Sequence, residues 1–582
     1  MTSSIHGGNL VVRSLIKHNV KHVFTLCGGH ISPILVGCEQ EDITVIDTRH
    51  EVTAVFAADG VSRLTGIPGV AIVTAGPGVT NTITAIKNAQ MAQTPLILIG
   101  GSAATLLKGR GSLQDIDQIK LMKSLVKWSK TIKKVKNIIP ILDQAFKKSM
   151  SGIPGPVFIE IPIDLLYPEQ IVRKWHEPKK VPNNLFQKIT NKYIQWHLDR
   201  QFSGNYQETI STQLAVVHPT PRNKQIKQFL ELISISKRPV MVIGGQTVFK
   251  VFDVKETKEA IENLNIPCYL SGKARGLIEK DNSLLYRHKR REALKSADLV
   301  ILLGVPMDFR LDYGRIINSK ANLVRVNRDI SLLRQNSDLR RAKMTIKADP
   351  AIFLQLVSKN LSANHEEWID WKAELQKNEE LREKEILGFS KDNAKLINPV
   401  KFFIHLKDKL PEKTIIIADG GDFISTMSYI IQPNQPLKWM DPGPFGTLGT
   451  GAGFAIAAKL CNPDYHVFLF YGDGSIGFSL SEFDTFIRHN IPILAIVGND
   501  GAWSQIAREQ ISLFGSDVST KLKQSEYHKV VEGFKGKGIL IKTLSEVYPA
   551  LESAYDYLLQ NKAVLLNVLL DNSDFRKGSI SM

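Results

Sequence analysis

Two acidic residues in the last third of the chain each follow a run of apolar residues. Asp473 ends "VFLFYGD" and Asp500 ends "ILAIVGND", so both carboxylates come where a buried strand is expected to end. The carboxyl ends of parallel strands meet at one edge of a sheet, where ligands bind. Two carboxylates there suit Mg²⁺, which completes its coordination shell with phosphate oxygens and water. An Asp-Gly pair alone usually marks a turn, but the two strand ends together favour a metal and phosphate site.

A further acidic residue, Glu51, stands among apolar neighbours in "DTRHEVTAVFAADG". A single carboxylate after a strand is more often the first residue of a helix, where the helix dipole stabilises it. In a cleft, the same group can act as a general acid or base. Taken alone, Glu51 supports the structural interpretation more than the catalytic one.

Two glycine-rich stretches accompany these acids. "DPGPFGTLGTGAGFAIAAKL" contains Gly449 and Gly451 at a spacing typical of dinucleotide sites, but no clear strand precedes it and Asp464 follows too early. We interpret it as a glycine-rich floor for another ligand. The Gly-Pro-Gly of "TAGPGVTN" lies between a strand and a helix, and we expect a tight connection there.

Short apolar runs alternate with helical patterns throughout the chain, which is typical of α/β domains with parallel sheets. The fold class predicted is therefore α/β, with three consecutive doubly wound parallel-sheet domains. The expected strands lie at residues 22–26, 43–47, 69–76, 95–101 and 152–168 in the first domain, 238–245, 266–272, 297–305 and 321–329 in the second, and 414–421, 466–475, 492–500 and 563–571 in the third.

Changes in composition set the expected domain boundaries. The domains are predicted at residues 1–176, 225–360 and 397–582, joined by a linker at 177–224 and a charged linking helix at 361–396. The first linker is polar and irregular but contains the amphipathic stretch "LFQKITNKYIQWHLDRQF". We expect its aromatic face to pack on its own protein more readily than on a membrane, which is the alternative.

Composition excludes several classes of function. Among 582 residues, 74 are Lys or Arg and 57 are Asp or Glu, a net charge of +17, but the basic residues are spread out rather than grouped with aromatic ones, so no nucleic-acid partner is expected. A lysine-rich surface is the simplest explanation, and attraction for phosphorylated or CoA-linked substrates is the alternative. Four scattered cysteines predict neither a disulfide framework nor a zinc site. With no transmembrane anchor or leader pattern seen, a cytoplasmic location is expected.

With Glu51, Asp473 and Asp500 considered together, the chain resembles the thiamine-diphosphate enzymes of the acetohydroxyacid synthase superfamily over nearly its whole length. Within that superfamily it is similar to the acetolactate synthase-like proteins, also called 2-hydroxyacyl-CoA lyases. The stretches that carry the resemblance occur in order: "GGHISP", "DTRHEVTAVFAAD", "TAGPG", "KNAQMAQ", "GPVFIEIPIDLLYP", "DGGDF", "GPFGTLG", "EFDTF" and "VGND".

The resemblance implies a pyrimidine-binding first domain, a central domain and a pyrophosphate-binding third domain. It implies active sites between the first domain of one subunit and the third domain of its partner, hence a homodimer or homotetramer. The corresponding central region of some relatives binds FAD or ADP, and Gly244, Gly245, Arg275 and Asn327 are the candidates for such a nucleotide here.

The resemblance also implies the role of each site residue. Glu51 is expected to hydrogen-bond the cofactor's aminopyrimidine, while Asp473, Asp500 and the Ala502 carbonyl bind Mg²⁺; many relatives carry Asn in place of Asp500. His30 and Gln114 are the other catalytic candidates, and for His30 a purely structural hydrogen bond is about as well supported. The remaining cofactor-binding candidates are Gly28, Gly29, Gly421, Asp422, Gly446, Thr447, Leu448, Gly474 and Ser475.

Three functions follow from these expectations. The favoured one is a lyase that splits 2-hydroxyacyl-CoA into formyl-CoA and an aldehyde, and the alternative is an acetolactate synthase that joins 2-oxo acids such as pyruvate. A non-catalytic assembly protein is disfavoured, because such a protein has no need of Glu51 directed at the cofactor. The family analogy adds association with the endoplasmic reticulum as an alternative location.

Overall fold

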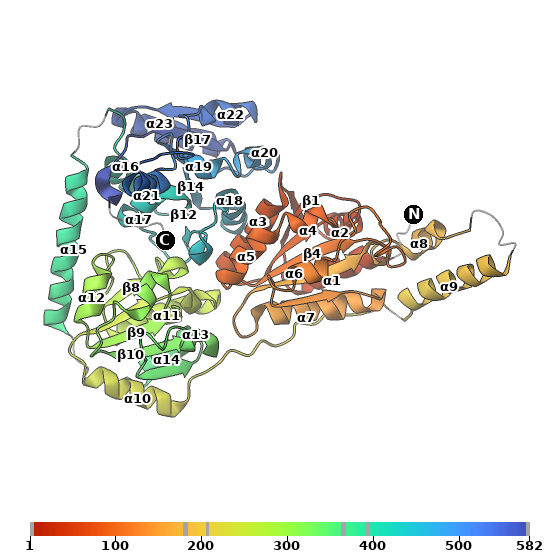
Figure 1. Ribbon diagram of the computed structural model, residues 1–582, viewed down its shortest axis with the longest axis horizontal. Helices are drawn as coiled ribbons and strands as arrows, with labels where there is room; N and C mark the ends of the chain where they lie inside the picture. Colours follow the sequence, from red (N-terminus) through yellow and green to blue (C-terminus); the bar gives the residue numbers. More distant parts are fainter. Residues whose placement is uncertain are drawn as a thin grey trace. The chain divides into compact units, whose positions relative to one another are not determined.

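The computed structural model describes residues 5–178, 184–204, 206, 209–361, 368–391 and 395–577. The chain forms two compact units, shown as ribbons in Figure 1. One comprises Met1–Ser62, Ile67–Val216 and Gly443–Thr447, and the other comprises Arg63–Gly66, Val217–Pro442 and Leu448–Met582.

The first unit is built on a six-stranded parallel sheet in the order β2-β1-β3-β4-β6-β5. Every residue of β3 and β4 is buried, as expected for strands covered by helices on both faces. The strands are β1 (His22–Leu26), β2 (Thr44–Asp47), β3 (Gly69–Val73), β4 (Leu96–Ser102), β5 (Trp128–Thr131) and β6 (Pro156–Pro162).

The helices of this unit pack their apolar faces on the sheet and on one another; α1, for example, packs against α2 and α7. The helical segment that follows the Gly-Pro-Gly stretch is divided into α4 and α5, and between them the Thr82 hydroxyl donates to the Val79 carbonyl at 2.7 Å. The helices are α1 (Gly7–Lys17), α2 (Ser32–Gln40), α3 (Glu51–Thr65), α4 (Pro77–Thr80), α5 (Ile83–Met91), α6 (Gln118–Met122), α7 (Ile138–Met150), α8 (Glu169–Trp175) and α9 (Leu185–Gln201).

The second unit contains two parallel sheets. The smaller, central one has the order β11-β10-β9-β7-β8 and contributes to a core of aliphatic and aromatic side chains. Its strands are β7 (Pro239–Ile243), β8 (Cys268–Leu270), β9 (Leu299–Leu303), β10 (Asn322–Asn327) and β11 (Met344–Lys347); its helices are α10 (Asn223–Ser234), α11 (Val254–Leu264), α12 (Arg290–Ser296), α13 (Ile330–Arg334) and α14 (Pro350–Lys359).

The long helix α15 (Ile369–Phe389) leads to the second sheet of this unit, as the charged sequence predicts. That sheet has six parallel strands in the order β13-β12-β14-β15-β17-β16. Its strands are β12 (Thr414–Asp419), β13 (Trp439–Met440), β14 (His466–Gly472), β15 (Leu494–Asn499), β16 (Lys537–Ile541) and β17 (Val564–Leu569). The helices around it are α16 (Pro399–Lys407), α17 (Gly421–Ile430), α18 (Gly451–Cys461), α19 (Asp473–Ile476), α20 (Phe483–Arg488), α21 (Ser504–Phe514), α22 (Tyr527–Gly533) and α23 (Val547–Leu559).

The predicted fold class is confirmed: the structure has three parallel-sheet α/β domains. The strands that the sequence did not predict, β5, β11, β13 and β16, all lie at sheet edges. An edge strand needs no continuous apolar run, because one of its sides is open to solvent. In the part of the chain that the structure describes, no helix is both long enough and apolar enough to cross a lipid bilayer.

Candidate active site

Asp473 and Asp500 lie at the same edge of the last sheet. β14 and β15 pair in parallel with Gly472 opposite Gly498, so the residues that follow the two strands are neighbours. The main-chain N–H of Gly501 donates to Asp473 Oδ2 at 2.8 Å, and that of Gly474 donates to Asp473 Oδ1 at 2.8 Å. These bonds orient the Asp473 carboxylate toward the loop that carries Asp500.

The electrostatics of this edge favour a bound cation. Burial and the negative charge of Asp500 raise the pKa of Asp473 to about 7. Burial also raises the pKa of Asp500, with a further contribution from Asp422. A divalent cation between Asp473 and Asp500 would offset both the desolvation and the mutual repulsion of the two carboxylates.

The donor set fits Mg²⁺. Asp500 Oδ1 accepts the Ala502 N–H at 3.3 Å and Oδ2 accepts the Ser504 hydroxyl at 2.5 Å, which leaves each oxygen a lone pair for a metal. Among the residues that the structure describes, none donates to the Ala502 carbonyl. Two carboxylates and one carbonyl are hard oxygen ligands of the kind that Mg²⁺ binds together with phosphate and water.

Asp422, a predicted cofactor-binding residue, begins α17 beside the same edge. It forms an ion pair with Arg508 of α21, and Arg576 lies 4.0 Å from its other oxygen. Burial raises the pKa of Asp422, and the two arginines oppose that shift. The carboxylate is therefore already neutralised by Arg508, a residue that the sequence reasoning did not identify.

Two of the predicted cofactor-binding glycines, one in each unit, form open, left-handed turns. Gly421 has a φ of +82° and Gly446 a φ of +66°, and a Cβ at either position would meet no atom within 4 Å. A Cβ at Gly420 would lie 2.4 Å from the Leu448 side chain, so only glycine fits beside that leucine. Open space in front of Gly421 and Gly446 fits the main-chain approach that a diphosphate or a cofactor ring requires.

Asp419, at the end of β12, holds the glycine-rich turn that precedes α18. Its two carboxylate oxygens accept the N–H groups of Gly449 at 3.0 Å and Gly451 at 2.7 Å. Burial raises the pKa of Asp419 to about 7, against these two bonds. Asp419 therefore positions the loop that carries Thr447 and Leu448, and its role was not recognised from sequence.

Gly474 and Ser475 are both close to this edge, but their contacts are with the protein itself. The Ser475 hydroxyl donates to the carbonyl of Asp419 at 2.5 Å, with the Gly472 carbonyl 3.0 Å away. A Cβ at Gly474 would lie 2.3 Å from the Trp503 ring. Both residues thus join β14 to neighbouring segments.

In the first unit, Glu51 is the first residue of α3 and is 6% exposed. The Asn81 side-chain amide donates to Glu51 Oε2 at 2.9 Å. His50 Nδ1 is 4.0 Å from the same oxygen but accepts the Val52 N–H. The carboxylate is therefore held mainly by Asn81, which lies in the Gly-Pro-Gly stretch expected to be only a connection.

The same stretch contacts the other two catalytic candidates. His30 Nδ1 lies 3.1 Å from Thr74 Oγ1, and burial lowers the pKa of His30. Gln114 has a φ of +62°, and a Cβ on Gly76 would lie 2.7 Å from the Gln114 carbonyl oxygen. Glu51, His30 and Gln114 therefore all lie against residues 74–81.

Gln118, which was not predicted as a site residue, also contacts this segment. Its Oε1 accepts the Gly76 N–H at 2.9 Å, and its Nε2 donates to Glu160 at 3.0 Å. Gly28 packs on Thr74, where a Cβ would lie 2.5 Å from the threonine side chain, whereas the space in front of Gly29 is open.

Comparison with known proteins identifies the family of this chain. The family model for the thiamine pyrophosphate enzyme N-terminal TPP binding domain matches residues 5–121, that for the central domain matches residues 226–357, and that for the C-terminal TPP binding domain matches residues 419–568. The chain is 47% identical to 2-hydroxyacyl-CoA lyase 2 of Danio rerio over 581 residues, covering 99% of this chain and 93% of the relative. The chain belongs to the thiamine pyrophosphate enzymes.

Two further relatives define its place in that family. 2-Hydroxyacyl-CoA lyase 2 of Homo sapiens is 43% identical over 586 residues, covering 99% of this chain and 92% of the relative. A probable acetolactate synthase of Mycobacterium bovis is 33% identical over 577 residues, covering 98% and 96%. The resemblance inferred from the sequence is confirmed, and the enzyme carries the two TPP binding domains of the family.

A basic cavity of about 600 Å³ lies in the second unit of this enzyme. Arg290 Nη2 donates to the Arg310 carbonyl at 2.9 Å, and the Arg275 guanidinium lies 4.5 Å from the centre of the Trp439 ring. Among the described residues, neither Arg275 nor Arg290 forms an ion pair with a carboxylate. The lining includes Tyr269, Arg275, Arg290, Arg310, Arg382 and Tyr429.

The lining of this cavity contains more basic than acidic side chains. Burial lowers the pKa of Arg290, and the nearby Arg310 and Arg275 lower it further. Burial also lowers the pKa of Arg275, against the opposite effect of the charge of Asp441. Two guanidinium groups that form no direct ion pair among the described residues are suited to bind an anion, and phosphate is the anion whose geometry arginine matches best.

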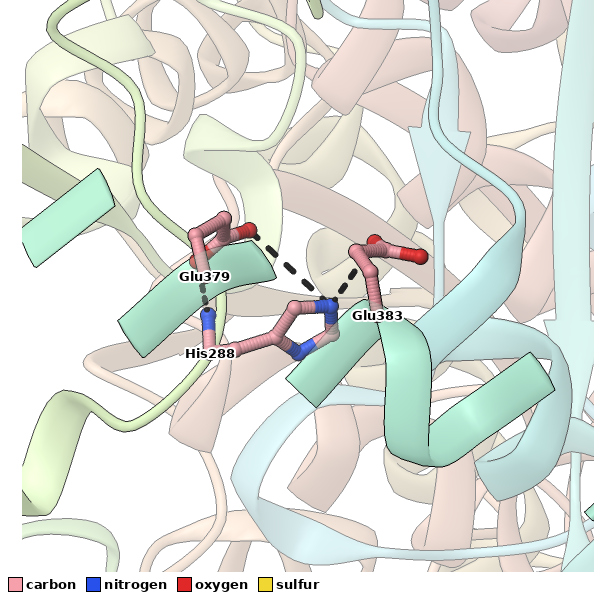
Figure 2. A group of neighbouring side chains, drawn as sticks. All are labelled: His288, Glu379 and Glu383. Atoms are coloured by element: carbon pink, nitrogen blue, oxygen red, sulfur yellow. Dashed lines mark hydrogen bonds and ion pairs between the residues drawn. The ribbon is translucent and has the colours of Figure 1, made fainter. Parts of the chain in front are cut away.

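Beside this cavity, His288 lies between two carboxylates of α15 (Figure 2). His288 Nε2 is 3.0 Å from Glu383, while the His288 main-chain N–H donates to Glu379 at 2.9 Å. Arg287 forms an ion pair with Glu383 and lies 3.5 Å from Glu379. Although burial opposes it, the His288 hydrogen bond and the charge of Arg287 lower the pKa of Glu383. The carboxylates are thus already occupied, and the cluster fixes the loop before α12.

The other central-domain candidates are in contact with neighbouring protein atoms. Asn327 is buried and accepts a hydrogen bond from Gln246 at 3.1 Å. A Cβ at Gly244 would lie 2.6 Å from the Gly304 carbonyl oxygen, and one at Gly245 would lie 3.1 Å from the Lys273 side chain. Of the four residues considered for FAD or ADP, Arg275 lines the cavity described above, and nucleotide binding at this strand edge stays a prediction.

Proposed function

We propose that this protein is a thiamine-diphosphate- and Mg²⁺-dependent lyase that cleaves 2-hydroxyacyl-CoA into formyl-CoA and an aldehyde. In that reaction the bond between C1 and C2 breaks, the hydroxyl-bearing carbon becomes the aldehyde, and the thioester carbon gains hydrogen. The names and the 43–47% identity of the lyase relatives support this choice. The acetolactate synthase relative, at 33%, supports the alternative less strongly.

The observation that supports the acyl-CoA assignment is the pair Arg275 and Arg290, which form no direct ion pair among the described residues and line a cavity that also contains aromatic side chains. A CoA thioester brings several phosphate charges and an adenine ring. Pyruvate has a single carboxylate and is too small to fill a cavity of about 600 Å³. The charge and size of the cavity therefore favour a CoA substrate over a small 2-oxo acid.

Thiamine diphosphate, when bound, supplies a nucleophilic thiazolium carbon and an electron sink for cleavage of the C–C bond. We propose that Glu51 holds a proton at its carboxylate for the aminopyrimidine and that Asn81 fixes the orientation of that carboxylate. Asp473, Asp500 and the Ala502 carbonyl would hold Mg²⁺, with Gly421, Gly474 and Ser475 around the diphosphate. Leu448 and Gly446 would contact the cofactor rings, and His30 and Gln114 would face the substrate.

A non-catalytic assembly role is less well supported. The negative charge of Asp500 makes the ionised form of Asp473 less favourable. The nearly buried carboxylate of Glu51 accepts a hydrogen bond from Asn81. Such arrangements lower stability unless a ligand or a reaction requires them. We further propose a homodimer, with a homotetramer as the alternative, and a cytoplasmic location, with association with the endoplasmic reticulum as the alternative.

The deciding experiment supplies the enzyme, loaded with thiamine diphosphate and Mg²⁺, with 2-hydroxyacyl-CoA in one reaction and pyruvate in another. We expect aldehyde and formyl-CoA from the first and little acetolactate from the second. Acetolactate without aldehyde would favour the synthase. If wild type and Glu51→Gln were equally inactive with both substrates while still binding the cofactor, the assembly role would be favoured.

A further inference from the structure

Helix α9 (Leu185–Gln201) presents a row of large apolar side chains to solvent. Five of them, Leu185, Phe186, Ile189, Tyr193 and Trp196, are 54–77% exposed. With about 100° of rotation per residue, these positions fall within an arc of about 100° on one side of the helix. Such a continuous apolar face is different from single exposed apolar residues, which are normal on protein surfaces. We call these five residues the outer face of α9.

The opposite side of α9 is anchored to its own unit. Leu198 is fully buried in the hydrophobic core of that unit, and Ile194 packs against the same core. Gln201 donates to Asp164 at 2.9 Å and to Thr105 at 2.5 Å. The helix is therefore already packed on one side, and its outer face is not needed for that packing.

Figure 1 shows α9 beside α8, with its amino-terminal half extending past α7. Arg173 of α8 forms an ion pair with Asp199 at 2.8 Å and lies 3.4 Å from Gln195. These contacts fix the direction of the carboxyl-terminal half of the helix. The carboxyl-terminal part of the outer face is consequently held as a fixed ridge on the first unit.

Positive charges flank this ridge. Lys188 and Lys192 are exposed along one side of the outer face, and Arg200 lies near its carboxyl-terminal end, 5.6 Å from the Trp196 ring. The single acidic residue of α9, Asp199, is paired with Arg173. The apolar face thus carries an excess of positive charge, and Trp and Tyr are the aromatic residues that favour the boundary between lipid and water.

We propose that the outer face of α9 docks on an anionic phospholipid surface, with the helix axis parallel to the membrane. The five apolar side chains would enter the boundary between headgroups and acyl chains, while Lys188 and Lys192 would contact lipid phosphates. This places the protein on a membrane surface through its first unit without requiring a spanning helix. The proposal is independent of the reaction that the enzyme catalyses.

The test measures flotation of the full-length protein with vesicles of phosphatidylcholine, with and without phosphatidylserine. We expect binding to the vesicles that contain phosphatidylserine, and a loss of about tenfold when Phe186, Ile189 and Trp196 are all replaced by Ser. Lys188→Glu combined with Lys192→Glu should weaken binding and remove its dependence on salt. Leu559→Ser and Lys529→Glu, on helices of the second unit, are the matched controls and should bind as the wild type does.

Two results would overturn the proposal. If the triple serine variant floats as well as the wild type, the outer face does not contact lipid. If that variant instead has a lower mass by light scattering in the absence of vesicles, the face is covered by a second copy of the chain. Thermal unfolding of the variants, compared with that of the controls, establishes that the fold is intact before binding is measured.

Discussion

The side-chain amide of Asn81 donates a hydrogen bond of 2.9 Å to the carboxylate of Glu51. Asn81 follows α4, and Glu51 begins α3, so the bond joins two segments that are 30 residues apart in the sequence. It also explains why the Gly-Pro-Gly turn must be rigid, because the turn determines where Asn81 lies. Residues 74–81 are therefore part of the candidate site and not merely a connection.

Replacing Asn81 should reduce catalysis through the orientation of Glu51. Asn81→Asp keeps the shape but exchanges the donor for a second carboxylate, so it should lower kcat more than Asn81→Ser, by about a hundredfold against about tenfold. KM should change little in either variant, because Asn81 is not proposed to touch the substrate. Steady-state kinetics provides the measurement, and equal losses in the two variants would contradict a donor role.

Asp473 and Asp500 should respond differently to replacement by asparagine. Both oxygens of Asp473 accept main-chain N–H groups, so an amide nitrogen at either position would face a donor. In Asp500→Asn the amide nitrogen can donate to the Ser504 hydroxyl, while Oδ1 still coordinates. We expect Asp473→Asn to require at least about tenfold more Mg²⁺ for half-maximal activity, and Asp500→Asn to remain close to wild type. The measurement is activity as Mg²⁺ is added back to enzyme treated with a chelator. A greater Mg²⁺ requirement for Asp500→Asn than for Asp473→Asn would contradict the prediction.

The domains were easier to predict than the contacts inside the candidate site. Buried parallel strands such as β14 and β15 are recognisable in the sequence as continuous apolar runs. Because the carboxyl ends of parallel strands meet at one edge of a sheet, Asp473 is then expected beside Asp500. Asn81, Gln118, Asp419 and Arg508 gave no such signal, because each acts on a partner far away in the sequence. A polar residue whose partner is known only from the fold cannot be distinguished by local pattern from an ordinary surface residue.

Asp419 should make the stability of the protein depend on pH. Burial raises its pKa from 3.8 to about 7, so between these values the folded state holds a proton that the unfolded state releases. The contribution of Asp419 to stability is therefore largest at low pH and decreases as the pH rises toward about 7. Asp419→Asn lacks this titration. Urea unfolding at about pH 5 and about pH 8 should show the wild type losing about 1 kcal/mol or more relative to the variant, and parallel pH profiles would contradict the assignment.

The two arginines of the cavity provide a test of the CoA assignment. Arg290→Gln and Arg275→Gln should each raise KM for 2-hydroxyacyl-CoA by about tenfold, because each removes a charged partner of phosphate, and should leave kcat nearly unchanged. Arg315→Gln is the matched control, since its side chain is 61% exposed and is not part of the cavity lining. With a 2-hydroxyacyl thioester that lacks the nucleotide, all three variants should match the wild type. Equal losses with both thioesters would show that the arginines act on folding rather than on the nucleotide.

The proposed homodimer can be tested with Glu51→Gln and Asp473→Asn, assayed at a Mg²⁺ concentration too low to support the activity of Asp473→Asn. If each active site combines Glu51 of one subunit with Asp473 of its partner, then Glu51→Gln and Asp473→Asn chains in one dimer contain one site with both changes and one site with neither. The purified mixed dimer would then have about half of wild-type activity. If each site is instead formed within one chain, every site in the mixed dimer carries one change and no activity returns. The measurement is turnover after the two variants are coexpressed with different tags and the mixed dimer is purified, and each variant alone is the control.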